Sequence, residues 1–81
     1  MTISNIITQR IKKAKKRYWA GDNISGYLYD GDKEALIEEL TEKFNGVLDS
    51  LIIDRENDPN SHGTGKRLAK MYINELMSGR Y

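Results

Sequence analysis

Apolar residues recur every three or four positions in three stretches of the chain, and segments rich in glycine and aspartate separate these stretches. This spacing is typical of helices that bury one face. It predicts an all-α fold of about three helices, at residues 4–20, 33–52 and 65–78. The alternation expected of a β-strand is absent from every segment of useful length.

The middle stretch carries the most continuous apolar stripe. Its members are Leu36, Ile37, Leu40, Phe44, Val47, Leu48, Leu51 and Ile52. Gly46 interrupts this helix at a cost of about 1 kcal/mol relative to alanine, which suggests the close approach of another helix. The glutamates at its start suit the helix dipole, and we interpret them as a solvated face rather than as paired catalytic acids.

Residues that favour helix ends stand beside each stretch. A polar side chain can accept a hydrogen bond from the first free amides, and glycine can adopt the left-handed conformation that ends a helix. The expected start and stop residues are Thr2 or Ser4 and Gly21 for the first helix, Asp30 or Asp32 for the second, and Thr64 and Gly79 for the third.

Length and composition limit the possible classes of protein. Eighty-one residues allow one small helical domain (residues 1–81), near the lower size at which a core stabilises itself. The chain has no cysteine and one histidine, so neither a disulfide nor a zinc site of the usual ligands is expected. No apolar run approaches the length of a membrane span. We therefore expect a soluble, cytoplasmic chain without a cofactor of its own.

Charge is distributed in blocks although the net charge is only +1. Residues 1–20 form a predicted basic amphipathic helix without any acidic residue, whereas residues 21–60 are strongly acidic. The simplest interpretation is that the basic residues form a solvated helix face and that their long aliphatic stems cover apolar neighbours. The alternatives are contact with nucleic-acid phosphates or an acidic protein, and a helix on a membrane surface. The candidate interaction residues are Arg10, Lys12, Lys13, Lys15, Lys16 and Arg17.

Two loops superficially resemble ligand sites. Residues 21–32 contain three aspartates, but their spacing does not match a calcium-binding loop. Residues 62–66 read His-Gly-Thr-Gly-Lys, yet Asn60 replaces the first glycine of a phosphate-binding loop and Arg67 replaces its Ser or Thr. A weaker anion site near Lys66 and Arg67 stays open. We expect Arg67 to tie the third helix to the acidic loop.

The stretch from residue 56 to residue 81 carries the one family resemblance. The residues involved are Asp58, Pro59, Thr64, Arg67, Ala69, Met71, Tyr72, Glu75 and Gly79. In this order and spacing they resemble the signature that precedes the catalytic domain of GTP cyclohydrolase I, and the resemblance extends over residues 33–80. Gly65 departs from it, because the family usually has proline at this first helical position. Glycine is less preorganised there, so a looser helix start is expected.

The resemblance implies an enzyme family that converts GTP to 7,8-dihydroneopterin triphosphate, as in tetrahydrofolate biosynthesis. Its zinc and catalytic residues belong to a β-sheet domain that follows the signature. No catalytic, cofactor-binding or metal-binding residue is therefore assigned to these 81 residues, and the signature residues are carried over as structural ones. We expect a non-catalytic helical part that acts in assembly, through self-association or a protein partner. The alternatives are a stand-alone helical protein that binds and modulates another protein, and a nucleic-acid-binding module that uses the basic helix.

Overall fold

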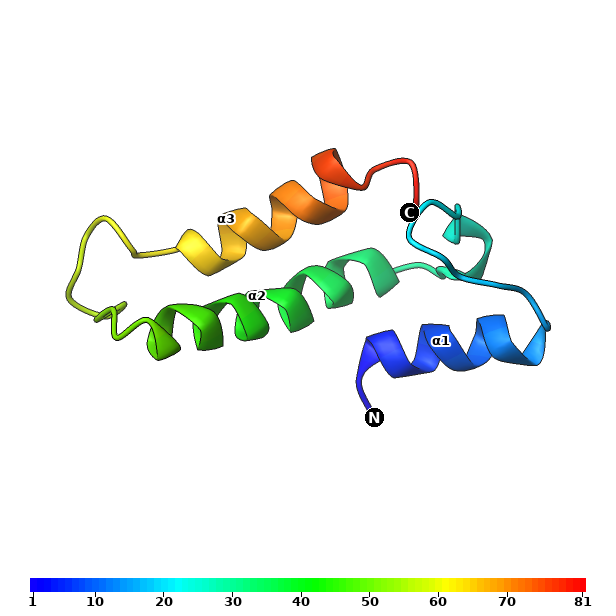
Figure 1. Cartoon of the computed structure of the whole chain (residues 1–81), viewed down its shortest axis with the longest axis horizontal. Coiled ribbons are helices and arrows are strands. Elements are labelled where there is room, and N and C mark those ends of the chain that lie inside the picture. Colours follow the sequence, from blue (N-terminus) through cyan, green and yellow to red (C-terminus); the bar gives the residue numbers. More distant parts are fainter.

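The computed structural model describes all 81 residues and is entirely helical. It contains the α-helices α1 (Ile3–Lys13), α2 (Asp32–Ser50) and α3 (Thr64–Met71), and α3 continues into a π-helical turn, η2 (Tyr72–Leu76). A single 3₁₀ turn, η1 (Ser25–Tyr27), lies between α1 and α2. Helices α2 and α3 form an antiparallel hairpin, and α1 lies against the first half of α2 only (Figure 1). The all-α prediction is confirmed.

The main core lies where α1, α2 and η2 meet. One apolar residue or more comes from each of these elements, and the loop before η1 adds another. The buried members are Ile7, Ile11, Ile24, Leu36 and Ile73. Residues 21–31 thus attach to the core through apolar side chains, because Ile24 is buried and Tyr27 and Leu28 pack partly against it. Burial of these side chains is the dominant stabilising contribution at this end of the molecule.

Helix α1 ends well before the predicted residue 20. Lys15 adopts a left-handed conformation (φ 57°), its amide donates to the carbonyl of Lys12, and the amide of Lys16 donates to the carbonyl of Ile11. This is the Schellman arrangement that terminates helices, here with lysine in the position that glycine usually occupies. Residues 14–20 therefore form no helix, and neither Ala14 nor Tyr18 extends the buried stripe.

The expected capping residues are only partly confirmed. Thr2 caps α1, since its hydroxyl accepts from the amide of Asn5 at 3.3 Å. Helix α2 begins after Gly31, which is left-handed, and neither Asp30 nor Asp32 caps it. Asp32 instead accepts from the amide of Tyr29 at 2.8 Å.

The predicted ends of the third helix are also corrected. Gly63 precedes α3 in a left-handed conformation (φ 77°), and no side chain caps the helix, so the prediction for Thr64 is wrong. Gly79 is not left-handed, and the helical turns end at Leu76, the last residue of the wider π-helical turn η2. Gly63, rather than a threonine cap, thus provides the turn at the start of α3, and no left-handed glycine ends the helix.

Close approach of α2 and α3 depends on Gly65 rather than on Gly46. A Cβ atom at Gly65 would overlap the side chain of Asn45 and lie 3.2 Å from the carbonyl oxygen of Thr41. A Cβ atom at Gly46 would meet nothing within 4 Å, so the interhelical role suggested for Gly46 is wrong. Glycine at position 65 therefore serves the packing of α3 against α2.

Candidate functional site

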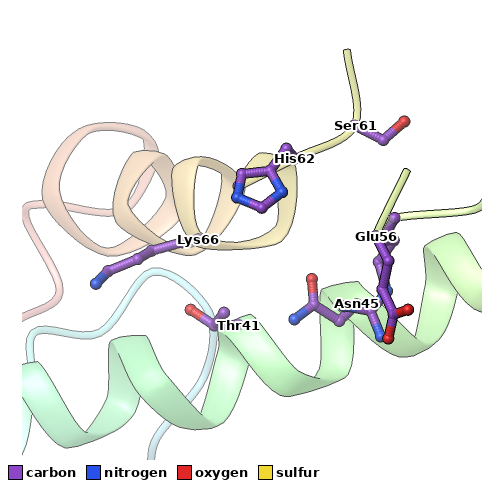
Figure 2. A pocket seen from close by; sticks show the side chains of 8 residues that line it. Thr41, Asn45, Glu56, Ser61, His62 and Lys66 are labelled. Carbon is purple, nitrogen blue, oxygen red and sulfur yellow. The ribbon is translucent and has the colours of Figure 1, made fainter. Parts of the chain in front are cut away.

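A polar depression lies between α2 and the start of α3. It encloses about 190 Å³ and is lined by no hydrophobic residue. Figure 2 shows Thr41 and Asn45 projecting from α2 toward the first turn of α3, with His62 and Lys66 on the opposite side. The lining residues are Thr41, Asn45, Arg55, Glu56, Ser61, His62, Gly63 and Lys66.

The arginine of this depression, Arg55, is already engaged by a carboxylate. Arg55 donates to both carboxylate oxygens of Asp49, at 2.7 and 3.1 Å. These hydrogen bonds lower the pKa of Asp49 and raise the pKa of Arg55. His62 and Lys66 are exposed and make no ion pair. The charges left unpaired are Lys66 and Glu56, which have opposite signs, so the depression is an open polar surface without a net charge of its own.

The His-Gly-Thr-Gly-Lys segment beside it does not form a phosphate cradle. The amide of Thr64 donates to the carbonyl of Ser61 at 3.2 Å, and the hydroxyl of Ser61 donates to Asp58 at 2.8 Å. These groups close a turn instead of pointing at a ligand. Within the whole chain, no group of three or more histidine, cysteine, aspartate or glutamate side chains is placed to hold a metal ion.

The residues that resemble the cyclohydrolase signature occupy structural positions in the hairpin. Asp58 accepts from the amide of Asn60 at 2.9 Å and so shapes the turn that contains Pro59. Ala69 is completely buried, and the ring of Tyr72 stacks on Phe44 with a centroid distance of 5.5 Å. The signature therefore forms the turn before α3 and the contact of α3 with α2.

Other signature residues make fewer contacts than expected. Arg67 is exposed and donates to the hydroxyl of Thr64 at 3.1 Å, within the same helical turn. It forms no ion pair, so the prediction that it ties α3 to the acidic loop is wrong. Met71 is half-buried and Glu75 is exposed.

The six basic candidates near the N-terminus divide into two groups. Arg10 is half-buried and donates to Asp32 at 2.5 Å and to the carbonyl of Tyr27 at 2.9 Å. Arg17 donates to Asp22 at 3.0 Å. The remaining four are exposed and form no ion pair or side-chain hydrogen bond: Lys12, Lys13, Lys15 and Lys16.

Sequence reasoning missed Arg80, which holds the loop after α1 in place. Its guanidinium donates to the carbonyls of Trp19 at 2.6 Å, Asp22 at 3.0 Å and Tyr18 at 3.3 Å. Asp22 closes the same loop by accepting from the amide of Trp19 at 2.8 Å. That bond, followed by the contact with Arg17, keeps the pKa of Asp22 below its usual value. Backbone carbonyls some 60 positions away leave no signal in the sequence.

The far end of the hairpin exposes apolar side chains that no element covers. Val47 is 55% exposed, Leu51 64% and Ile52 93%. Ile52 also adopts a left-handed conformation (φ 62°), which β-branched residues rarely do. The amides of Ile52 and Ile53 donate to the carbonyls of Asp49 and Leu48, so α2 ends in a second Schellman turn.

No family model, curated protein or solved structure matches this chain. The resemblance to GTP cyclohydrolase I thus rests on the signature residues themselves. None of the helices combines the length with the apolar character needed to cross a membrane.

Proposed function

We propose that the chain is the N-terminal helical part of a GTP cyclohydrolase I-like protein and acts in its assembly. In this proposal the exposed end of the α2–α3 hairpin docks on a sheet domain of the kind that follows the signature in that family. The chain itself performs no chemistry on GTP.

The first support is the structural use of the signature. Residues separated along the sequence, from Asp58 to Tyr72, combine into one turn and one interhelical contact. A signature that builds a hairpin is suited to positioning that hairpin on another domain.

The observation that carries the proposal is Ile52. A left-handed backbone costs an L-residue other than glycine roughly 1–2 kcal/mol. Ile52 recovers none of this by burial within the chain, because its side chain is 93% exposed. An apolar residue that is both strained and solvated in isolation is explained if a partner covers it.

Val47 and Leu51 extend the same surface. Val47 lies in the last turn of α2 and Leu51 caps that turn four positions later, so their side chains share a face, and both are more than half exposed. We name Val47, Leu51 and Ile52 the apolar end of the hairpin. All three side chains are aliphatic, so this surface is suited to a water-excluding contact with another protein rather than to a polar ligand.

The experiment measures the mass of the purified chain in solution, alone and mixed with the sheet domain of a GTP cyclohydrolase I that lacks its own helical region. The key variant is Ile52→Gly. It removes the backbone strain and is expected to raise the free energy of unfolding by about 1 kcal/mol. The same variant is expected to weaken association, because it removes the most exposed apolar side chain.

Lys15→Gly is the matched control, since Lys15 occupies the equivalent left-handed position after α1. It should stabilise the chain similarly and leave association unchanged. A chain that stays monomeric with and without the sheet domain would contradict the proposal, and so would GTP ring opening by the isolated chain. Association with a different protein, but not with the sheet domain, would favour the stand-alone binding protein instead.

A further inference from the structure

The surface just after α1 concentrates positive charge without neutralising it. Residues 12–21, which we name the basic segment, are exposed throughout. They contain no acidic residue, and the four lysines among them have no partner within the chain. Four unpaired ammonium groups within five positions create a local positive potential that attracts a polyanion.

One exposed aromatic ring, Trp19, lies within this segment, and a second, Tyr29, lies against Arg10 of α1. Each ring has an arginine against one face. The guanidinium of Arg17 lies 4.3 Å from the ring centroid of Trp19, and that of Arg10 lies 3.8 Å from the ring centroid of Tyr29. Trp19 is still 68% exposed and Tyr29 62% exposed. An arginine on one face orients a ring and leaves the other face available for stacking.

The loop that carries Trp19 is held in a defined shape. The Schellman turn at Lys15 directs the chain away from α1, and Arg80 and Asp22 bind the backbone around Trp19. A surface whose backbone is already ordered loses less conformational entropy when it binds.

The way in which α1 packs argues against a membrane as the partner. An interfacial helix needs a free apolar face, but Ile7 and Ile11 are 3% and 2% exposed and belong to the core. The basic segment itself is not helical beyond Lys13 and offers no aliphatic side chain larger than alanine. Charge with exposed aromatic rings, and without an insertable apolar face, is the combination that binds unpaired nucleotides.

We propose that the basic segment and Tyr29 form a binding surface for single-stranded nucleic acid. Lys12, Lys13, Lys15 and Lys16 contact phosphates, and Trp19 and Tyr29 stack on bases. This surface is separate from the apolar end of the hairpin, so its function does not depend on the docking proposed above.

Fluorescence anisotropy of a fluorescein-labelled oligothymidylate, titrated with the whole chain at several salt concentrations, tests the proposal. Trp19 is the only tryptophan, so quenching of its emission reports stacking directly. Trp19→Ala is expected to weaken binding about fivefold to a hundredfold. Lys15→Gln with Lys16→Gln is expected to lower the slope of log Kd against log salt by about 1.4, because each phosphate contact on a single strand contributes about 0.7.

Lys43→Gln with Lys70→Gln is the matched control, since these lysines are exposed on α2 and α3 and lie outside the basic segment. It should bind like the unaltered chain. Trp19→Phe should retain most of the affinity, and circular dichroism checks that every variant is folded.

Four results would overturn the proposal. They are absence of binding at low salt, binding that salt does not weaken, unchanged affinity of Trp19→Ala, and equal affinity for a duplex with the same number of phosphates. Binding to vesicles that contain phosphatidylserine, without binding to the oligonucleotide, would assign the surface to a membrane.

Discussion

The two halves of α2 have opposite surroundings. The first half packs against α1, the loop before η1 and η2, and it contributes Leu36 to the five-residue core cluster. The second half lies along the α3–η2 helix and not against α1 (Figure 1). There Leu48 and Ala69 are buried, while Val47 and the following Leu51 are more than half exposed. The N-terminal half of α2 thus belongs to a small core, and its C-terminal half projects from that core.

This difference shows where the chain is self-sufficient. Only eight of its 81 residues are buried, and most of them lie at the α1 end, so the projecting end is stabilised by a single helix–helix contact. Apolar residues are present at both ends, but at the projecting end Val47, Leu51 and Ile52 stay exposed. The projecting end is therefore the part of the fold that gains most from a partner.

The largest expected effect compares a core side chain with one at the projecting end. Ile73→Ala should lower the free energy of unfolding by about 2–5 kcal/mol, because Ile73 is 1% exposed and its loss leaves a cavity. Leu51→Ala should change it by less than about 0.5 kcal/mol, since that side chain is mostly solvated. Chemical denaturation measures both values. Equal losses would mean that Leu51 is covered in solution, as in a self-associated chain.

A second pair of variants examines the contact that holds the projecting end. Gly65→Ala should destabilise the chain by about 1–3 kcal/mol, because its Cβ atom would overlap Asn45 and approach the carbonyl of Thr41. Gly46→Ala should stabilise it by up to about 1 kcal/mol, as the added methyl group meets nothing. Thermal unfolding of the two variants gives the comparison. A neutral Gly65→Ala would show that α2 and α3 can separate slightly without loss.

The smallest effect concerns the attachment of α1 and depends on pH. Glu39 of α2 accepts from the hydroxyl of Ser4 at 2.6 Å and from its amide at 3.0 Å. Partial burial raises the pKa of Glu39, but these hydrogen bonds and the charge of Lys43 outweigh it, so the pKa lies below the usual 4.5. Glu39→Gln should cost about 1–2 kcal/mol at neutral pH.

The sign of the pH dependence follows from that lowered pKa. The unfolded chain binds a proton more readily than the folded one, so the contribution of Glu39 is complete above pH 4.5. It is lost as the pH falls through the folded-state pKa. Glu39→Gln should therefore lose less stability on acidification than the unaltered chain. Asp49→Asn is the control at the projecting end, where the exposed pair with Arg55 should contribute little. If Asp49→Asn changed the loss of stability on acidification more than Glu39→Gln does, the carboxylate at the projecting end would be the more important one.

The periodic pattern located the helices better than the local signals located their ends. Helix α2 spans Asp32–Ser50 against a predicted 33–52, because a long stripe of apolar positions must face one side. The predicted first helix is too long, because the left-handed residue that ends it is Lys15 and not the glycine that usually occupies this position. The turn at Ile52 could not be predicted for the same reason, since isoleucine rarely adopts a left-handed conformation.

The candidate site shows the same division. The basic residues were recognisable from composition, but which of them stay free depends on Asp32 and Asp22, which engage Arg10 and Arg17. The glycine important for helix packing is Gly65 rather than Gly46, and both have identical local propensity. Only the position of the neighbouring helix separates them.

The sequence by itself determined that the chain is helical, which positions are apolar, and where positive charge accumulates. These properties depend on which residues follow one another along a segment, and the sequence gives that order directly. The tertiary structure alone decided which apolar residues are covered, how Arg80 holds the loop around Trp19, and why Ile52 stands exposed at the end of α2. Each of these depends on groups that meet in space, and the linear order of residues does not record such meetings.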